Sequence, residues 1–120
     1  MDTGAMGAQE FEDLVSASFA ELPAWVRRAV SDVALMTDDD PPADWTGPGQ
    51  LLGRFSGVPT TARGERAGGS LPNRIELYRV PILRVSHSRM EVVEQIRRVL
   101  RHEIGHALGL GDERLRELDY

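Results

Sequence analysis

The chain has 120 residues, of which 41% are hydrophobic and 28% are charged, as expected for one ordinary globular domain. Its net charge of −5 provides no basic surface for nucleic acid or for an anionic membrane, so we expect neither as a partner. The absence of cysteine excludes disulfides, thiolate metal sites and cysteine catalysis.

The N-terminal sequence and the hydropathy predict a soluble, cytoplasmic protein. The first residues, MDTGAMGAQEFED, lack the positive and apolar regions of a signal peptide, and no stretch approaches about 18 consecutive apolar residues. We therefore expect a flexible tail over residues 1–8 and a single domain over residues 9–120.

Two helices are predicted first along the chain. Apolar residues recur at the i, i+3, i+4, i+7 spacing over residues 9–22, which is typical of an amphipathic helix. Pro23 suits the first turn of a second, shorter helix over residues 23–30. The side chains expected to face inward from this second helix are Trp25, Val26 and Val30.

Short strands are predicted next. The apolar runs DVALM (residues 32–36) and LLGRF (residues 51–55) are separated by an acidic, proline-rich loop. A long connection rich in Gly, Pro and Thr follows over residues 57–73. RIELYRVPIL then alternates in polarity until Pro81, which cannot donate to a ladder, so this strand is predicted to lie at a sheet edge or to end there.

A long helix begins near Ser88, which can act as its N-cap with Glu91 as the capping-box partner. Its predicted apolar stripe consists of Val92, Ile96, Val99 and Leu100. A last short helix is predicted over residues 112–118.

The most informative stretch is RHEIGHALGLGDE, near the C-terminal end of the sequence. His102 and His106 are four residues apart on the predicted helix, so both imidazoles project from one face and can bind a single metal ion. Glu103 lies beside that face, where a carboxylate can take a proton from a metal-activated water. Gly109 allows a sharp reversal at the helix end, which can bring Asp112 back as a third ligand.

The segment HEIGHALGLGD resembles the HExxHxxGxxH/D signature of the metzincin clan of zinc metallopeptidases, with Asp112 in place of the usual third histidine. Together with the LPAWVRRAVSDVALMTDD stretch and the ending DERLRELDY, it is similar to the bacterial zincin-like family of minimal metalloproteases. The resemblance implies a small zincin-like domain that mixes helices and strands (α/β, more specifically α+β). In this domain a short, few-stranded sheet packs on the HExxH helix, and further helices lie at the N-terminus. The resemblance also implies one zinc ion bound by His102, His106 and Asp112. The implied activity is hydrolysis of peptides or unfolded proteins, with Glu103 as the general base.

One departure from the clan favours a second hypothesis. Metzincins carry a methionine-containing turn after the third ligand, whereas all four methionines here precede the motif. The alternative function is therefore a zinc-binding interaction or regulatory module with little or no proteolytic turnover. Metal-assisted hydrolysis of a non-peptide substrate is a third hypothesis.

The sequence also allows other roles for the individual residues. Asp112 can instead cap the last helix, in which case His87 or Glu113 would complete the metal site. The two histidines can also be ordinary residues of a helix end that binds no metal. For the substrate, the predicted edge strand over residues 74–80 offers backbone groups to which a peptide can add as an extra strand.

Overall fold

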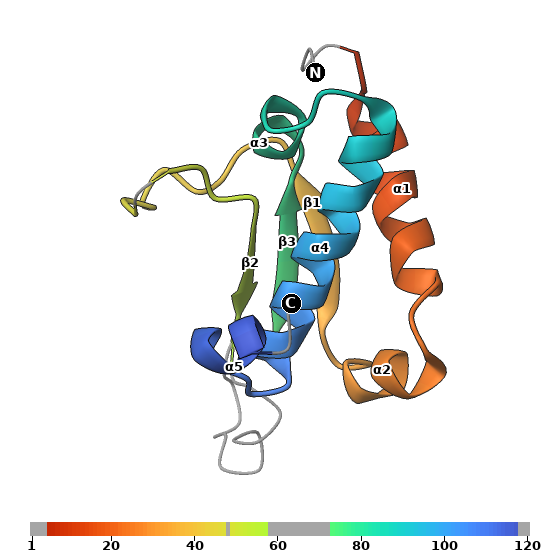
Figure 1. Ribbon diagram of the computed structural model, residues 1–120, viewed down its shortest axis with the longest axis vertical. Coiled ribbons are helices and arrows are strands. Elements are labelled where there is room, and N and C mark those ends of the chain that lie inside the picture. The colour runs from red at the N-terminus through yellow and green to blue at the C-terminus, as the bar shows by residue number, and fades with distance from the viewer. Residues whose placement is uncertain (1–4, 48, 58–72, 118–120) are drawn as a thin grey trace.

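The computed structural model describes residues 5–47, 49–57 and 73–117, which form a small mixed α+β architecture (Figure 1). The elements follow along the chain as α1 (Ala8–Ala20), α2 (Ala24–Ala29), β1 (Ala34–Asp38), β2 (Gly53–Ser56), β3 (Arg74–Tyr78), α3 (Arg79–Arg84), α4 (Arg89–Ala107) and α5 (Asp112–Glu117). The predicted fold class is confirmed, although β1 begins two residues later than the sequence predicts.

The sheet has three strands in the order β1–β3–β2. β1 runs parallel to β3, with Ala34 opposite Arg74, and β2 runs antiparallel to β3, with Gly53 opposite Leu77. β3 is thus the middle strand, and the prediction that residues 74–80 form a sheet edge is wrong. Among the described residues, the outer edges of β1 and β2 are the sheet edges with which a peptide can pair.

The other alternative predicted from Pro81, that the strand ends there, agrees with the structure, because the strand ends shortly before the chain reaches the proline. β3 stops at Tyr78, and Pro81 is the third residue of α3. In the first turn of a helix the N–H groups have no intrahelical partner, so the proline removes neither a ladder bond nor a helix bond.

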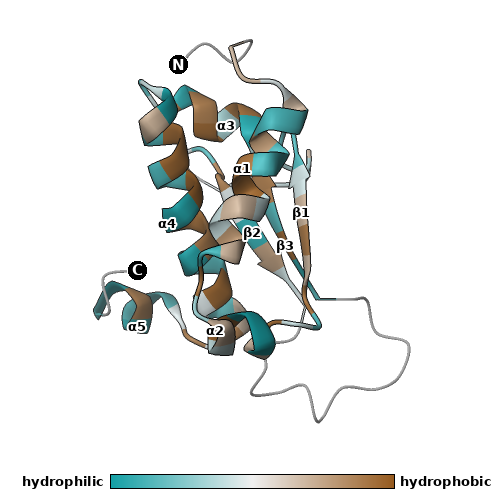
Figure 2. Ribbon diagram, turned by 90° about the vertical axis from the view of Figure 1, so that its right-hand side faces the viewer, coloured by the Kyte–Doolittle hydropathy of each residue, from teal (hydrophilic) through white to brown (hydrophobic). Residues whose placement is uncertain are grey.

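Helices α1 and α4 lie against one face of the sheet and against each other (Figures 1 and 2). Ile75 and Leu77 of β3 are buried in the same core. Ser88 caps α4 as predicted, because its Oγ accepts a hydrogen bond from the Glu91 N–H at 3.1 Å. The buried apolar side chains of α4 are Val92, Ile96, Val99, Leu100, Ile104 and Ala107. With this stripe buried, the polar side of α4 is left to carry the motif histidines.

The N-terminal segment departs from the prediction at two points. Trp25 does not face inward, because its six-residue helix has no buried residue and leaves the indole 62% exposed. Met6, which falls in the predicted tail, is buried in the core, and Arg79 Nη1 donates a hydrogen bond to its carbonyl oxygen at 2.7 Å. The packed part of the chain therefore includes Met6 and begins before residue 9.

The long connection predicted over residues 57–73 lies almost entirely outside the described residues. No helix in the described part of the chain combines the length and apolar character needed to cross a membrane.

Candidate metal centre

The motif occupies the C-terminal end of α4 and the start of α5. His102 and His106 lie one turn apart on α4, and their Nε2 atoms are 3.2 Å apart. The His102 and His106 side chains are 34% and 28% exposed, so both are accessible to solvent although one face of α4 is buried in the core. The backbone of α4 therefore sets the position of both rings.

Helix α4 ends in a Schellman turn that depends on Gly109. The φ of Gly109 is 93°, in the left-handed region, as the sequence predicts. Gly109 N–H donates to the His106 carbonyl at 2.9 Å. Leu110 N–H donates to the Gly105 carbonyl, also at 2.9 Å. Together these two bonds satisfy carbonyl groups at the end of the helix.

The same turn fixes the tautomer of His106. It brings the Leu110 carbonyl oxygen to 2.9 Å from His106 Nδ1. A carbonyl oxygen can only accept a hydrogen bond, so Nδ1 must carry the proton. In the neutral ring the lone pair of His106 then lies on Nε2, which is the atom directed at His102.

Asp112 lies in a much shorter helix than the two histidines, with fewer buried residues to anchor it. It is the first residue of the six-residue helix α5, and its side chain is 72% exposed. Leu115 is the buried residue of that helix, and it packs on Gly105 in the middle of the motif. A Cβ at position 105 would collide with Leu115 Cδ2, so a larger residue there would force the Leu115 side chain or α5 to shift. Gly105 thus allows the close packing that places Asp112.

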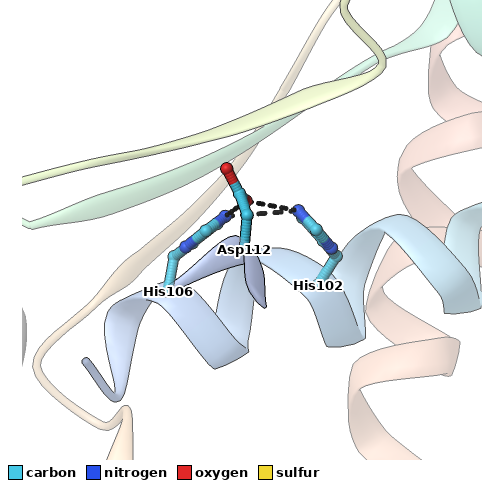
Figure 3. Close-up of side chains that lie close together, drawn as sticks. All are labelled: His102, His106 and Asp112. Carbon is cyan, nitrogen blue, oxygen red and sulfur yellow. Dashed lines mark hydrogen bonds and ion pairs between the residues drawn. The ribbon is translucent and has the colours of Figure 1, made fainter. Parts of the chain in front are cut away.

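The three side chains converge (Figure 3). Asp112 Oδ1 lies 3.1 Å from His106 Nε2 and 3.7 Å from His102 Nε2. Two ligand atoms of a tetrahedral zinc ion, each about 2.0–2.1 Å from the metal, are separated by about 3.3 Å. The observed separations bracket this value. Two imidazole nitrogens and a carboxylate oxygen are also ligand types that zinc accepts, so the residues present fit a zinc ion.

The alternative third ligands are not part of this group. His87 is exposed just before the start of α4, and a separation of 15 residues at about 1.5 Å each places it roughly 22 Å from His102 along the helix. Glu113 is exposed and lies outside the group. Within the ranges that the structure describes, His102, His106 and Asp112 form the only cluster of metal-ligating side chains, with ligand atoms within 4.8 Å of one another.

Glu103 lies beside the group in a different environment. It is the only buried carboxylate among the described residues, and its side chain sits at the junction of α4 and β2. Its Oε1 accepts a hydrogen bond from the Phe55 N–H at 2.9 Å. Burial raises the pKa of Glu103 above its ordinary value of 4.5, whereas the neighbouring histidines and the Phe55 N–H oppose this rise. A carboxylate with a raised pKa accepts a proton more readily near neutral pH, as a general base must.

Gly53 lets β2 approach α4 closely enough for this contact. A Cβ on Gly53 would lie 2.5 Å from Val99 Cγ1 and 2.9 Å from the carbonyl oxygen of Glu76. The absence of a side chain therefore brings the outer edge of β2, where the Phe55 N–H points, against Glu103.

The residues that support the site were not predicted from the sequence. Gly53 and Gly105 carried a signal, since an isolated glycine within a strand or helix indicates close approach of another segment. Phe55 carried none, because its contribution is a backbone N–H whose direction depends on the register of β2 on β3.

Comparison with known proteins adds the family. The zincin-like metallopeptidase model matches residues 30–120, which include the whole motif. The chain belongs to the zincin-like metallopeptidase family. The family resemblance in the sequence is thereby confirmed, and zinc is the metal that the family implies. No curated protein matches the sequence.

Among solved structures, this zincin-like chain is similar to a conserved hypothetical protein from T. thermophilus. The TM-score is 0.59 and the sequence identity is 24%, over 94% of this chain and 100% of that one. At this identity the likeness shows a shared fold.

Proposed function

We propose that this zincin-like protein is a zinc-dependent metallopeptidase in which His102, His106 and Asp112 hold one zinc ion. The observation that carries the proposal is the convergence of three ligand atoms, with separations of 3.1 to 3.7 Å. Because the proton of neutral His106 is on Nδ1, the Nε2 lone pair faces a carboxylate oxygen and a second imidazole. Two imidazole nitrogens and a carboxylate oxygen are ligand types that zinc accepts, so one ion can be bound by all three.

When bound, zinc supplies Lewis-acid chemistry, because it polarises a peptide carbonyl and lowers the pKa of water. Glu103 takes the proton of the attacking water and delivers it to the leaving amine. Burial supports this role, since it raises the pKa of the carboxyl group. The hydrogen bond from Phe55 orients the carboxylate.

The substrate is a peptide or an unfolded segment that adds to the outer edge of β2. This edge replaces residues 74–80 as the candidate strand, since β3 is paired on both sides. At the β2 edge, the Phe55 N–H reaches Glu103, so a chain lying there is beside the general base. Extended peptides commonly bind in this way, through backbone hydrogen bonds to an exposed strand.

Glu103→Gln tests the mechanism, because it removes the base and keeps the shape of the side chain. The variant should retain one equivalent of zinc by elemental analysis and lose about 10²- to 10⁴-fold in peptide hydrolysis. Glu94→Gln is the matched control, since Glu94 is an exposed glutamate of the same helix. Unchanged peptide turnover in Glu103→Gln would exclude Glu103 as the base.

The second candidate function is a zinc-binding interaction or regulatory module. The position of all four methionines before the motif favours it, because metzincins carry a methionine-containing turn after the third ligand. A parent protein that binds zinc tightly and hydrolyses no peptide would support this function instead.

A further inference from the structure

A groove of about 550 Å³ adjoins the metal group, which consists of His102, His106 and Asp112. It runs beside His102 and Glu103 along α4, and the residues of β2 and the segment before it form the opposite wall. Much of the lining is apolar and consists of Leu51, Leu52, Val85 and Val99. The size is typical of a site that binds a short segment of a ligand.

Two arginines line this groove, one from each helix of the metal group. Arg98 precedes His102 by four residues on α4, and Arg116 follows Asp112 by four residues on α5. Residues four apart lie on the same face of a helix, so Arg98 and Arg116 are each about one helical turn from a proposed metal ligand.

Neither guanidinium makes a hydrogen bond or an ion pair with any described residue. This distinguishes them from the arginines that are paired with carboxylates, which are Arg74, Arg79, Arg89, Arg97 and Arg114. Glu103 is the only carboxylate that lines the groove, and it is buried and already bonded to Phe55. The groove is therefore locally cationic, although the net charge of the chain is −5.

We propose that this groove selects peptides that carry an acidic side chain, Asp or Glu, flanked by apolar residues and next to the scissile bond. The planar guanidinium groups of Arg98 and Arg116 match a carboxylate with paired hydrogen bonds, and the apolar walls receive the neighbouring side chains. Cleavage next to the acidic residue rests on the proposed peptidase function. The preference for acidic peptides is a binding property, which is measured without turnover.

The test uses the zinc-loaded Glu103→Gln protein and two capped heptapeptides, Ala-Ala-Leu-Xaa-Leu-Ala-Ala, with Xaa as Glu or Gln and a neutral fluorophore. Fluorescence anisotropy should show roughly fivefold to tenfold tighter binding of the Glu peptide at low salt, with a smaller ratio at high salt because exposed charges are screened. Arg98→Ala combined with Arg116→Ala should reduce the ratio below about twofold, and the two Lys substitutions should retain part of it.

Arg28→Ala is the matched control, because Arg28 is an exposed arginine of α2 outside the groove. It should leave the ratio unchanged, and zinc content is measured for every variant to verify the metal group. Equal binding of the two peptides, including failure of both to bind, overturns the proposal. So does a preference that survives the double Ala substitution, since the metal itself would then attract the carboxylate.

Turnover of the same peptides by the parent protein separates the two proposals. Hydrolysis of both peptides at equal efficiency supports the peptidase function and contradicts charge selection. Selective binding of the Glu peptide with no hydrolysis of any peptide supports charge selection and contradicts the peptidase function.

Discussion

The histidines and the aspartate of the metal group are held by two very different regions of the molecule. His102 and His106 belong to a 19-residue helix whose opposite face is buried against the sheet. Asp112 belongs to a six-residue helix that is anchored by Leu115. On the proposed assignment, the contact between Leu115 and Gly105 therefore helps to position the third ligand. We therefore expect zinc affinity to fall most when a histidine is removed from α4, less when Asp112 is removed, and least when the contact between Leu115 and Gly105 is disturbed.

The largest effect is expected from His106→Ala, which removes a ligand from the rigid region. Zinc affinity should fall by more than about 100-fold, since even loss of an outer partner of a ligand typically costs about 10- to 100-fold. Competition with a chromophoric zinc chelator measures the change. His87→Ala is the matched control, because His87 is exposed at the other end of α4. One full equivalent of tightly bound zinc in His106→Ala would contradict the assignment.

Asp112→Ala should have a smaller effect, because the histidine pair remains in place on α4. We expect zinc affinity to fall by about 10- to 100-fold, with measurable binding left at the two histidines. The same chelator competition reports it, and Glu113→Ala is the neighbouring control. If Glu113→Ala weakened zinc binding and Asp112→Ala did not, the third ligand would be Glu113.

Gly105→Ala tests the contact that holds the weaker region. The added methyl group would meet Leu115 Cδ2, so we expect a loss of about 1–3 kcal/mol in the free energy of unfolding and about tenfold weaker zinc binding. Denaturant unfolding and chelator competition measure the two effects. Adding Leu115→Val should restore part of both, because valine is one methylene shorter and its methyl groups do not reach as far toward the added Cβ.

A double-mutant cycle separates this positional effect from general destabilisation. In the Asp112→Ala background, Gly105→Ala should no longer change zinc affinity, because the ligand that it displaces is gone. An equal loss of affinity in both backgrounds would show that Gly105 acts on the histidines instead.

The smallest effect is expected at the other end of the sheet and should leave the site untouched. Arg79 Nε donates a hydrogen bond to Asp39 Oδ1 at 2.9 Å, and this bond lowers the pKa of Asp39 below its ordinary value of 3.8. A carboxyl group whose pKa is lower in the folded state than in the unfolded state stabilises the fold at pH values above the unfolded-state pKa. This contribution is lost as the pH falls through the folded-state pKa. Asp39→Asn should therefore lower Tm slightly at neutral pH and not in strong acid, with zinc affinity unchanged. An equal decrease of Tm at both pH values would exclude the charge as the cause.

The features that were predicted correctly from the sequence are those determined by residues within one or two helical turns of one another. The Ser88 cap, the apolar stripe of α4, the histidine spacing and the reversal at Gly109 all depend on neighbouring residues. The position of β3 in the middle of the sheet depends instead on pairing with β1 and β2, which local alternation does not encode. The hydrogen bond from Phe55 to Glu103 joins residues 48 apart in the sequence, and its partner is a backbone group.

A crystal structure grown with zinc, with an anomalous difference map recorded at the zinc absorption edge, tests the central claim most directly. We expect a single peak about 2.0–2.2 Å from His102 Nε2, His106 Nε2 and one carboxylate oxygen of Asp112. A peak bound by Glu113 in place of Asp112, or no peak at the end of α4, would contradict it.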